Sequence, residues 1–229
     1  MIMTLDPLYW LMLLPCMLIA IYAQILVKNR YAKFSRLPIS SGLTGAEVAK
    51  YILENAGIHD VEIRPIAGEL TDHYNPLNKT LNLSENIYYG NSIAAAGIAA
   101  HEVGHALQHH FGYKPLIIRN AIVPFANLGS QLAFPLIFIG LIFHAFALIK
   151  LAIIFFSFAV GFTIITLPVE FDASYRAVKI LNNYHLLNEK ELNGVKKVLT
   201  AAALTYVASA LTAVMQLLYY IFLANRGDD

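Results

Sequence analysis

Cysteine and charge are both scarce in this sequence. Its 229 residues include one cysteine, Cys16, and only 14% of them are charged, against about a quarter in soluble domains. A single cysteine cannot pair within the chain, so an intramolecular disulfide and a multi-cysteine metal cluster are both excluded. The formal net charge is +1, so the overall charge gives no reason to expect nucleic-acid binding.

The sequence is instead rich in long apolar runs. Leu8–Val27 and Leu204–Leu223 each reach the length of about 20 residues that a helix needs to cross a bilayer. A third run, Leu132–Leu167, has 36 residues and would be about 54 Å long as one helix, too long for one crossing. We therefore divide it at His144–Lys150, where its only charge lies, and extend its first half back to Ile122. The sequence predicts four spans, at about 8–27, 122–143, 149–167 and 204–223.

Basic residues set the expected orientation of these spans. Lys28 and Arg30 follow the first apolar run, whereas a signal peptide carries its positive charge before the run, so an uncleaved anchor is expected. Segments 28–121 and 168–203 contain nine and five of the sixteen lysines and arginines. Because these residues accumulate in cytoplasmic loops, we expect both segments in the cytoplasm and both termini outside.

The polar segments contain the signals of short helices and strands. Thr44–Gly57 has the apolar spacing of a helix, Val61–Ile66 reads as a strand, and Leu70–Leu83 reads as a hairpin around Tyr-Asn-Pro. Ser92–His110 is the next helix, with a serine suited to cap it. The expected fold class is mainly α, with four spanning helices and a membrane-apposed α+β region. We expect one domain over residues 1–229.

Two histidines and a glutamate carry the chemistry of the helix 92–110. His101 and His105 are four residues apart, so they share one helical face and can bind one Zn²⁺. Zinc lowers the pKa of bound water to about 7. Glu102 can then accept a proton from that water and pass it to a leaving amine, as in zinc peptidases.

The alternative for this motif is a solvated helix face with paired histidines, because so short a pattern also occurs by chance. The surrounding sequence AAAGIAAHEVGHAL is small and apolar, and unpaired Glu and His are disfavoured there unless a metal or hydrogen bonds compensate them. We therefore favour zinc. His109 lies about 12 Å of helical rise from His101, so neither His109 nor His110 is expected to complete the site.

A catalytic zinc needs a third protein ligand, and the segment LPVEFDASYRA is its best source. It begins where the third span ends, and Pro168 predicts the first turn of a new helix there. Glu170 and Asp172 point about 200° apart on a helix, so only one of them can face the metal. We favour Glu170. Asp172 remains the alternative ligand, or a group that orients a ligand histidine.

Three sequence motifs of this chain together resemble those of a known family. HEVGHALQH, preceded by DHYNPLNKTLNLSENIY and followed after two spans by LPVEFDAS, resembles the YugP-type bacterial membrane zinc metallopeptidases over essentially the whole chain. The chain is also similar, more distantly, to gluzincin proteases such as the CAAX-prenyl endopeptidases and the heat-shock protease HtpX. This resemblance implies a multi-pass protein of the bacterial inner membrane that holds one Zn²⁺ per chain, with a gluzincin-like fold around the metal.

The resemblance also implies roles for individual residues. His101, His105 and Glu170 take the ligand positions and Glu102 that of the base. The distant relatives carry an acid four residues after the ligand glutamate, whereas this sequence has Ser174 there. In the distant relatives that acid orients a ligand. Here the orienting residue is either Ser174, at the same position, or Asp172.

The implied reaction is the hydrolysis of peptide bonds in peptides or proteins, including membrane proteins. The enzyme is also expected to contact membrane lipid. In such proteases an edge strand beside the active helix pairs with the substrate backbone, and the hairpin Leu70–Leu83 is the candidate. His73, Tyr74 and His185 are candidates for stabilising the oxyanion. The sequence names neither a substrate nor an oligomeric state.

Two other functions stay open at the level of the sequence. An intramembrane protease would hold its metal inside the bilayer, but the apolar run Ile93–Ala100 before His101 is too short for a span. A non-catalytic membrane scaffold or metal-binding regulator would have no need of a base, and Glu102 argues against it. A cytoplasmic site just beneath the membrane is the expectation.

Overall fold

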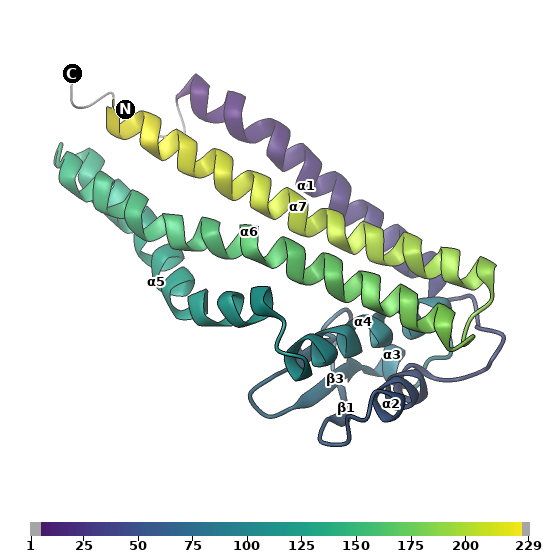
Figure 1. Ribbon diagram of the computed structural model, residues 1–229. Coiled ribbons are helices and arrows are strands. Elements are labelled where there is room, and N and C mark those ends of the chain that lie inside the picture. The colour runs from purple at the N-terminus through teal and green to yellow at the C-terminus, as the bar shows by residue number, and fades with distance from the viewer. Residues whose placement is uncertain (1–5, 226–229) are drawn as a thin grey trace. The chain divides into compact units, whose positions relative to one another are not determined.

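The computed structural model describes residues 6–225 as a mainly helical protein (Figure 1). The predicted outer location of the two chain ends concerns residues 1–5 and 226–229, which lie outside this range. The elements, in chain order, are α1 (Pro7–Phe34), α2 (Gly45–Asn55), β1 (Glu62–Ile66), β2 (His73–Asn75), β3 (Thr80–Ser84), α3 (Glu85–Tyr88), α4 (Ile93–His110), α5 (Lys114–Ile142), α6 (Phe146–Asn183) and α7 (Glu189–Asn225).

Four helices, α1, α5, α6 and α7, are long and apolar enough to cross a membrane. They confirm the expected fold class of a mainly α protein with four candidate spans and a small sheet. Contacts within the chain divide it into two compact units. The apolar unit comprises the described residues 6–23, 117–168 and 205–225, and the site unit comprises residues 24–116 and 169–204.

The long apolar run 132–167 is interrupted close to the expected place. α5 ends at Ile142 and α6 begins at Phe146, and His144 in the turn between them has a φ of 52°. Lys150 therefore lies inside α6 rather than in the turn. The prediction that a new helix begins at Pro168 is wrong, because α6 runs through this proline to Asn183. A proline removes one backbone donor from the helix, and this long helix continues in spite of that loss.

The core of the apolar unit combines aliphatic and tyrosine side chains. Ile137, Ile149 and Tyr219 are buried there, and the Tyr219 hydroxyl donates to the Asp6 carboxylate at 3.2 Å. Many other large apolar side chains of these helices are exposed, among them Phe134 and Phe138. A protein in water would bury such side chains, whereas lipid contacts them at no cost.

The sheet of the site unit has the strand order β1-β3-β2. β2 and β3 pair antiparallel, with Tyr74 opposite Leu81, so the predicted hairpin is confirmed. β1 lies on the other side of β3 and pairs with it in parallel. Leu81 and Leu83 are fully buried, as their alternation predicts. β2 is consequently an edge strand.

Two capped helices pack on this sheet. Thr44 and Glu47 form a reciprocal capping box at the start of α2, with each side chain accepting from the other residue's backbone N–H at 2.7 and 3.2 Å. The Ser92 hydroxyl accepts from Ala95 N–H at 3.1 Å and so caps α4 as expected. Figure 1 shows α2, α3 and α4 gathered beside β1 and β3.

Small residues let α4 approach its neighbours closely in the site unit. A Cβ atom added at Gly104 would lie 2.7 Å from the backbone oxygen of Ala173, and one at Gly97 would lie 3.0 Å from Val195. A real Cβ atom essentially never comes as close as the first of these separations, and the second would require Val195 to move by a few tenths of an ångström. The helix that carries the two histidines therefore packs directly against the segment of α6 that follows residue 168.

Candidate metal centre

Three side chains from two helices of the site unit converge on one point. The nitrogen and oxygen donor atoms of His101, His105 and Glu170 all lie within 4.8 Å of one another. Glu170 Oε2 is 3.3 Å from His101 Nε2 and 3.6 Å from His105 Nε2. The two imidazole rings are nearly perpendicular, at 86°, so their Nε2 atoms approach the carboxylate from different directions. The structure thus brings together the three residues that the sequence singled out as ligands.

Glu170 is a buried carboxylate held in its charged form. Its side chain is 4% exposed, and Oε2 is out of contact with solvent and accepts no well-aligned hydrogen bond. Burial alone raises the pKa of this carboxyl, but the His101 and His105 side chains beside it outweigh burial and hold the pKa well below its usual range. A buried anion that lacks a full set of partners is the expected state of a ligand designed for a cation.

His101 is oriented from its far side by a hydroxyl group. Its Nε2 faces Glu170, while its Nδ1 lies 3.1 Å from Ser174 Oγ. Ser174 is four residues after Glu170, so both side chains emerge from the same face of α6. The serine therefore contacts a candidate ligand at the position where the distant relatives have an acid.

His105 is oriented by a residue that the sequence analysis missed. Its Nδ1 lies 3.0 Å from Gln108 Oε1, and Gln108 is completely buried. The Gln108 amide nitrogen donates to Val169 O at 2.7 Å and to Asp172 Oδ2 at 2.8 Å. Asp172 thus acts on His105 only through Gln108, and it is not one of the converging donor groups. The spacing of three residues after His105, on the same helical face, was the available signal.

Glu102 is buried beside His101 and is tied to the sheet. Its exposed fraction is 8%, and its Oε2 accepts a hydrogen bond from the backbone N–H of Tyr74 at 3.1 Å. Tyr74 is the middle residue of the edge strand β2. β2 is held in turn by Asp72, whose carboxylate accepts from the backbone N–H of Ser84 at 2.7 Å. A short strand therefore sets the direction of the glutamate carboxylate.

The three oxyanion candidates have different surroundings. The Tyr74 hydroxyl bonds to His109 Nδ1 at 2.9 Å. His73 is exposed and its Nδ1 bonds to Thr71 O at 2.8 Å. His185 lies in the turn after α6, fifteen residues beyond Glu170 and about 20 Å further along the helix direction. The structure brings Tyr74 next to Glu102 and does not bring His185 to the centre.

The donor set fits a divalent metal of the zinc type. Two imidazole nitrogens with free Nε2 positions and one carboxylate oxygen form the His₂Glu set of catalytic zinc sites, which leaves a further coordination position open. The burial of Glu170 and the hydrogen bonds to both Nδ1 atoms are the features of a pre-formed site. With a base beside it, such a centre can activate water for attack on a carbonyl group.

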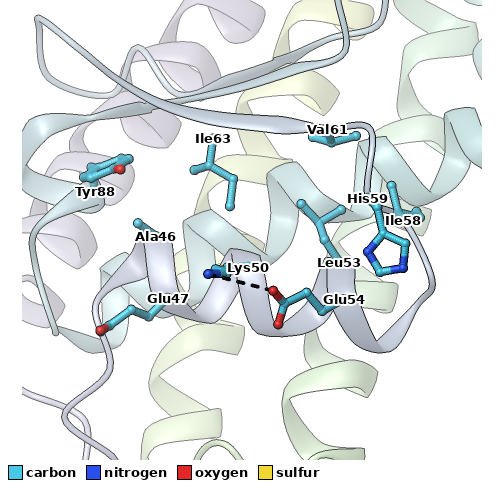
Figure 2. Close-up of a pocket in the computed structure, with 10 residues that line it drawn as sticks. All are labelled: Ala46, Glu47, Lys50, Leu53, Glu54, Ile58, His59, Val61, Ile63 and Tyr88. Carbon is cyan, nitrogen blue, oxygen red and sulfur yellow. Dashed lines mark ion pairs between the residues drawn. The ribbon is translucent and has the colours of Figure 1, made fainter.

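Two cavities of the site unit lie away from the three donors. The larger, of about 450 Å³, is lined by α2, β1, Tyr88 and the loop residues Ile58, His59 and Val61, and Lys50 and Glu54 form an ion pair across its edge (Figure 2). The smaller, of about 190 Å³, is lined among others by Tyr74, Ala106 and His109. The smaller cavity borders the strand that holds Glu102, and the larger one contains none of the residues predicted for the site.

Known proteins resemble this chain along nearly its whole length. Residues 9–225 match the model of the family described as "Putative neutral zinc metallopeptidase". The chain is 48% identical over 212 residues to the "Putative membrane protease YugP" of Bacillus subtilis (strain 168), covering 92% of this chain and 94% of that protein. No solved structure matches.

Proposed function

The chain belongs to the neutral zinc metallopeptidase family, and on that premise we propose that it hydrolyses peptide bonds in membrane or membrane-proximal proteins. In this proposal His101, His105 and Glu170 hold one Zn²⁺, and Glu102 is the catalytic base. The single observation that carries it is the convergence of two imidazoles on a buried carboxylate, with a second buried glutamate beside them. The family description "Putative neutral zinc metallopeptidase" and the homologue's name "Putative membrane protease YugP" support this substrate class.

Each residue of the proposed site has a separate role in hydrolysis. Zinc, when bound, supplies Lewis acidity that makes a hydroxide nucleophile available at neutral pH. Glu102 accepts the proton of the attacking water on its carboxylate and delivers it to the amine nitrogen that leaves. The Tyr74 N–H orients the Glu102 carboxylate for this transfer. Ser174 and Gln108 hold the two imidazole rings so that their Nε2 atoms face the metal.

The edge strand β2 is the proposed docking place of the substrate backbone. It pairs with β3 on one side only, and on its other side the Tyr74 N–H bonds to Glu102, so a substrate that pairs with this edge would lie beside the base. Backbone pairing places few demands on substrate sequence, which suits an enzyme that acts on varied proteins. The Tyr74 hydroxyl, bonded to His109 in this state, is the proposed oxyanion donor because it stands on the strand next to Glu102.

We also propose a topology for the four spans. Segments 28–121 and 168–203 lie in the cytoplasm with the catalytic residues, and both termini lie outside the inner membrane. The support is the accumulation of fourteen of the sixteen lysines and arginines in these two segments. A reporter enzyme that requires the cytoplasm should be active when fused after Arg36. Activity of an exported reporter at that position would overturn the topology.

The test of the function uses the purified protein in detergent. The wild type should contain about one zinc ion per chain and should cleave an unfolded reporter protein. Glu102→Gln should keep the zinc and lower turnover about 10²- to 10⁴-fold, the range for loss of a general base. Glu54→Gln, at an exposed helix position, is the matched control and should match the wild type. Comparing membrane peptides from cells with wild type and Glu102→Gln then identifies substrates.

The same variants separate the rival functions. A scaffold or metal-binding regulator should bind zinc and be unaffected by Glu102→Gln in cells. An intramembrane protease should cut labelled substrates within their spanning segments. Absence of stoichiometric zinc from the wild type would overturn the proposal as a whole.

A further inference from the structure

The hydrogen bonds around Gln108 define which way its amide group points. Its Nε2 atom lies 2.7 Å from a backbone carbonyl, Val169 O, and 2.8 Å from Asp172 Oδ2. A carbonyl oxygen never donates, and the Asp172 oxygen already accepts from Arg176 Nε at 2.6 Å. Both partners therefore require a donor, which only the amide nitrogen can supply. The amide oxygen is consequently left to face His105.

This fixed amide has a consequence for the imidazole of His105. An amide oxygen accepts only, so the nitrogen 3.0 Å away, His105 Nδ1, must carry a hydrogen. In the neutral ring the other nitrogen, Nε2, then has a free lone pair, and Nε2 is the atom that faces Glu170 at 3.6 Å. The opposite tautomer would point an N–H at the position of the metal and could not bind it.

We propose that Gln108 is a positioning residue that locks His105 into the metal-binding tautomer and aligns α4 with the segment of α6 that carries Glu170. This inference rests on the proposed metal centre and deepens it. The two acceptors of Gln108 lie one residue before and two residues after Glu170. The same amide therefore joins the second histidine ligand to the backbone of the third.

The other histidine lacks such a lock. His101 Nδ1 faces the hydroxyl of Ser174 at 3.1 Å, and a hydroxyl can either donate or accept by rotating its hydrogen. Ser174 therefore orients the ring of His101 without selecting a tautomer. The tautomer of His105 is therefore fixed by its hydrogen-bond partner, whereas that of His101 is not.

The environment of Gln108 makes its loss costly. The side chain is completely buried and uses three of its four hydrogen-bonding positions. Truncation therefore removes one hydrogen-bond partner each from His105 Nδ1, Val169 O and Asp172 Oδ2. Loss of a group that orients a metal ligand typically weakens metal affinity about 10- to 100-fold. Gln108→Leu should fall in this range, and Ser174→Ala should weaken binding less.

The experiment measures zinc affinity and histidine tautomers in the full-length protein in detergent. Affinity is obtained by competition with a chelator of known strength, and the tautomer from the ring ¹⁵N shifts of protein labelled at histidine. The wild type should show His105 as the Nδ1–H form, in the metal-free protein near neutral to basic pH and in the zinc-loaded protein. Gln108→Leu should bind zinc about 10- to 100-fold more weakly and lose the single tautomer in the metal-free state.

A second variant keeps the test decisive if Gln108→Leu fails to fold. Gln108→Met has nearly the length of glutamine but lacks the amide oxygen, so it fills the same space without accepting from His105 Nδ1. It should give mixed tautomers for His105 while the signal of His101 stays unchanged. A single Nδ1–H tautomer in metal-free Gln108→Met, or zinc affinity within about twofold of the wild type in folded Gln108→Leu, would overturn the inference. A wild type that binds no zinc would overturn the proposed function instead, so the two failures are distinct.

Discussion

Polar side chains are satisfied in different ways in the apolar unit and in the site unit. In the apolar unit the hydroxyls of Ser157 and Thr166 each donate at 2.7 Å to the backbone carbonyl four residues earlier in the same helix. In the site unit Ser174 bonds to His101, Gln108 to Asp172 and Asp72 to Ser84, and these partners lie 12 to 73 positions apart in the sequence. The apolar unit also has a distant bond, from Tyr219 to Asp6, but its hydroxyls mainly bond locally.

The difference follows from what each unit must do. A helix in lipid has to satisfy its polar groups within itself, because neither water nor a partner is assured there. A reactive centre has to fix groups from separate elements against one another, and that requires bonds between elements. Single substitutions of polar residues should therefore change stability little in the apolar unit, and should lower stability or zinc content in the site unit.

The largest effect should come from removing the third donor. Glu170→Ala deletes the only oxygen of the converging group, so zinc content should fall from about one ion per chain to near zero, and activity with it. Asp172→Ala is the matched control, since it removes a carboxylate that contacts Gln108 but is not a donor. Metal analysis of both purified proteins checks this. Greater loss of zinc in Asp172→Ala would reverse the assignment.

Two glycines of long helices compare the units directly. An added Cβ at Gly104 in the site unit meets Ala173 O at 2.7 Å, whereas one at Gly161 in the apolar unit meets nothing within 4 Å. Gly104→Ala should cost about 1 to 3 kcal/mol by overpacking and should also weaken zinc binding, since Ala173 lies between Glu170 and Ser174 in α6. Gly161→Ala should leave stability equal or slightly higher. Thermal unfolding in detergent measures both, and equal effects would contradict the close packing.

The pH dependence of stability should depend on Asp72 in the site unit. Burial raises the pKa of this carboxyl, its hydrogen bonds from Ser84 offset only part of that rise, and the charge of Glu102 adds to it. Because the folded pKa exceeds the unfolded one, its contribution to stability is complete below the unfolded value and is lost as pH rises through the folded value. Stability of wild type relative to Asp72→Asn should therefore decline as pH rises above about 4. Unfolding curves over a pH series test this, and the opposite slope would contradict it.

The smallest effect should come from a local bond of the apolar unit. Ser157→Ala removes a hydroxyl that is exposed and bonds within its own helix, so stability should change by less than about 0.5 kcal/mol. Zinc content should not change. A large loss of stability in detergent would show that this hydroxyl has a role beyond its own helix.

The sequence was most informative where function depends on local spacing. His101, Glu102 and His105 are brought together by one helical turn, so their arrangement follows from the period of a helix. The cap at Ser92 and the alternation of β3 were predicted from local patterns of the same kind. The four long apolar helices follow from the length of hydrocarbon that a span must cross.

The partners of these residues were harder to predict. Glu170 was expected from its place after a span, but Gln108 was passed over because its acceptors lie 61 and 64 residues further along. Ser174 was noted only as a departure from a family pattern, and its bond to His101 depends on the rotation of α6. Pro168 was misread because its local rule, that proline begins a helix, gives way where a long apolar helix continues through it.

The position of Glu170 in the chain has a consequence for the order in which the protein is made. The ribosome completes His101, Glu102 and His105 first, then all of α5 and most of the apolar part of α6, before it adds Glu170. The growing chain therefore carries a histidine pair and a glutamate but an incomplete donor set until this part of α6 has been made. Under the proposed function, cleavage should begin only after Glu170 has been added to the chain.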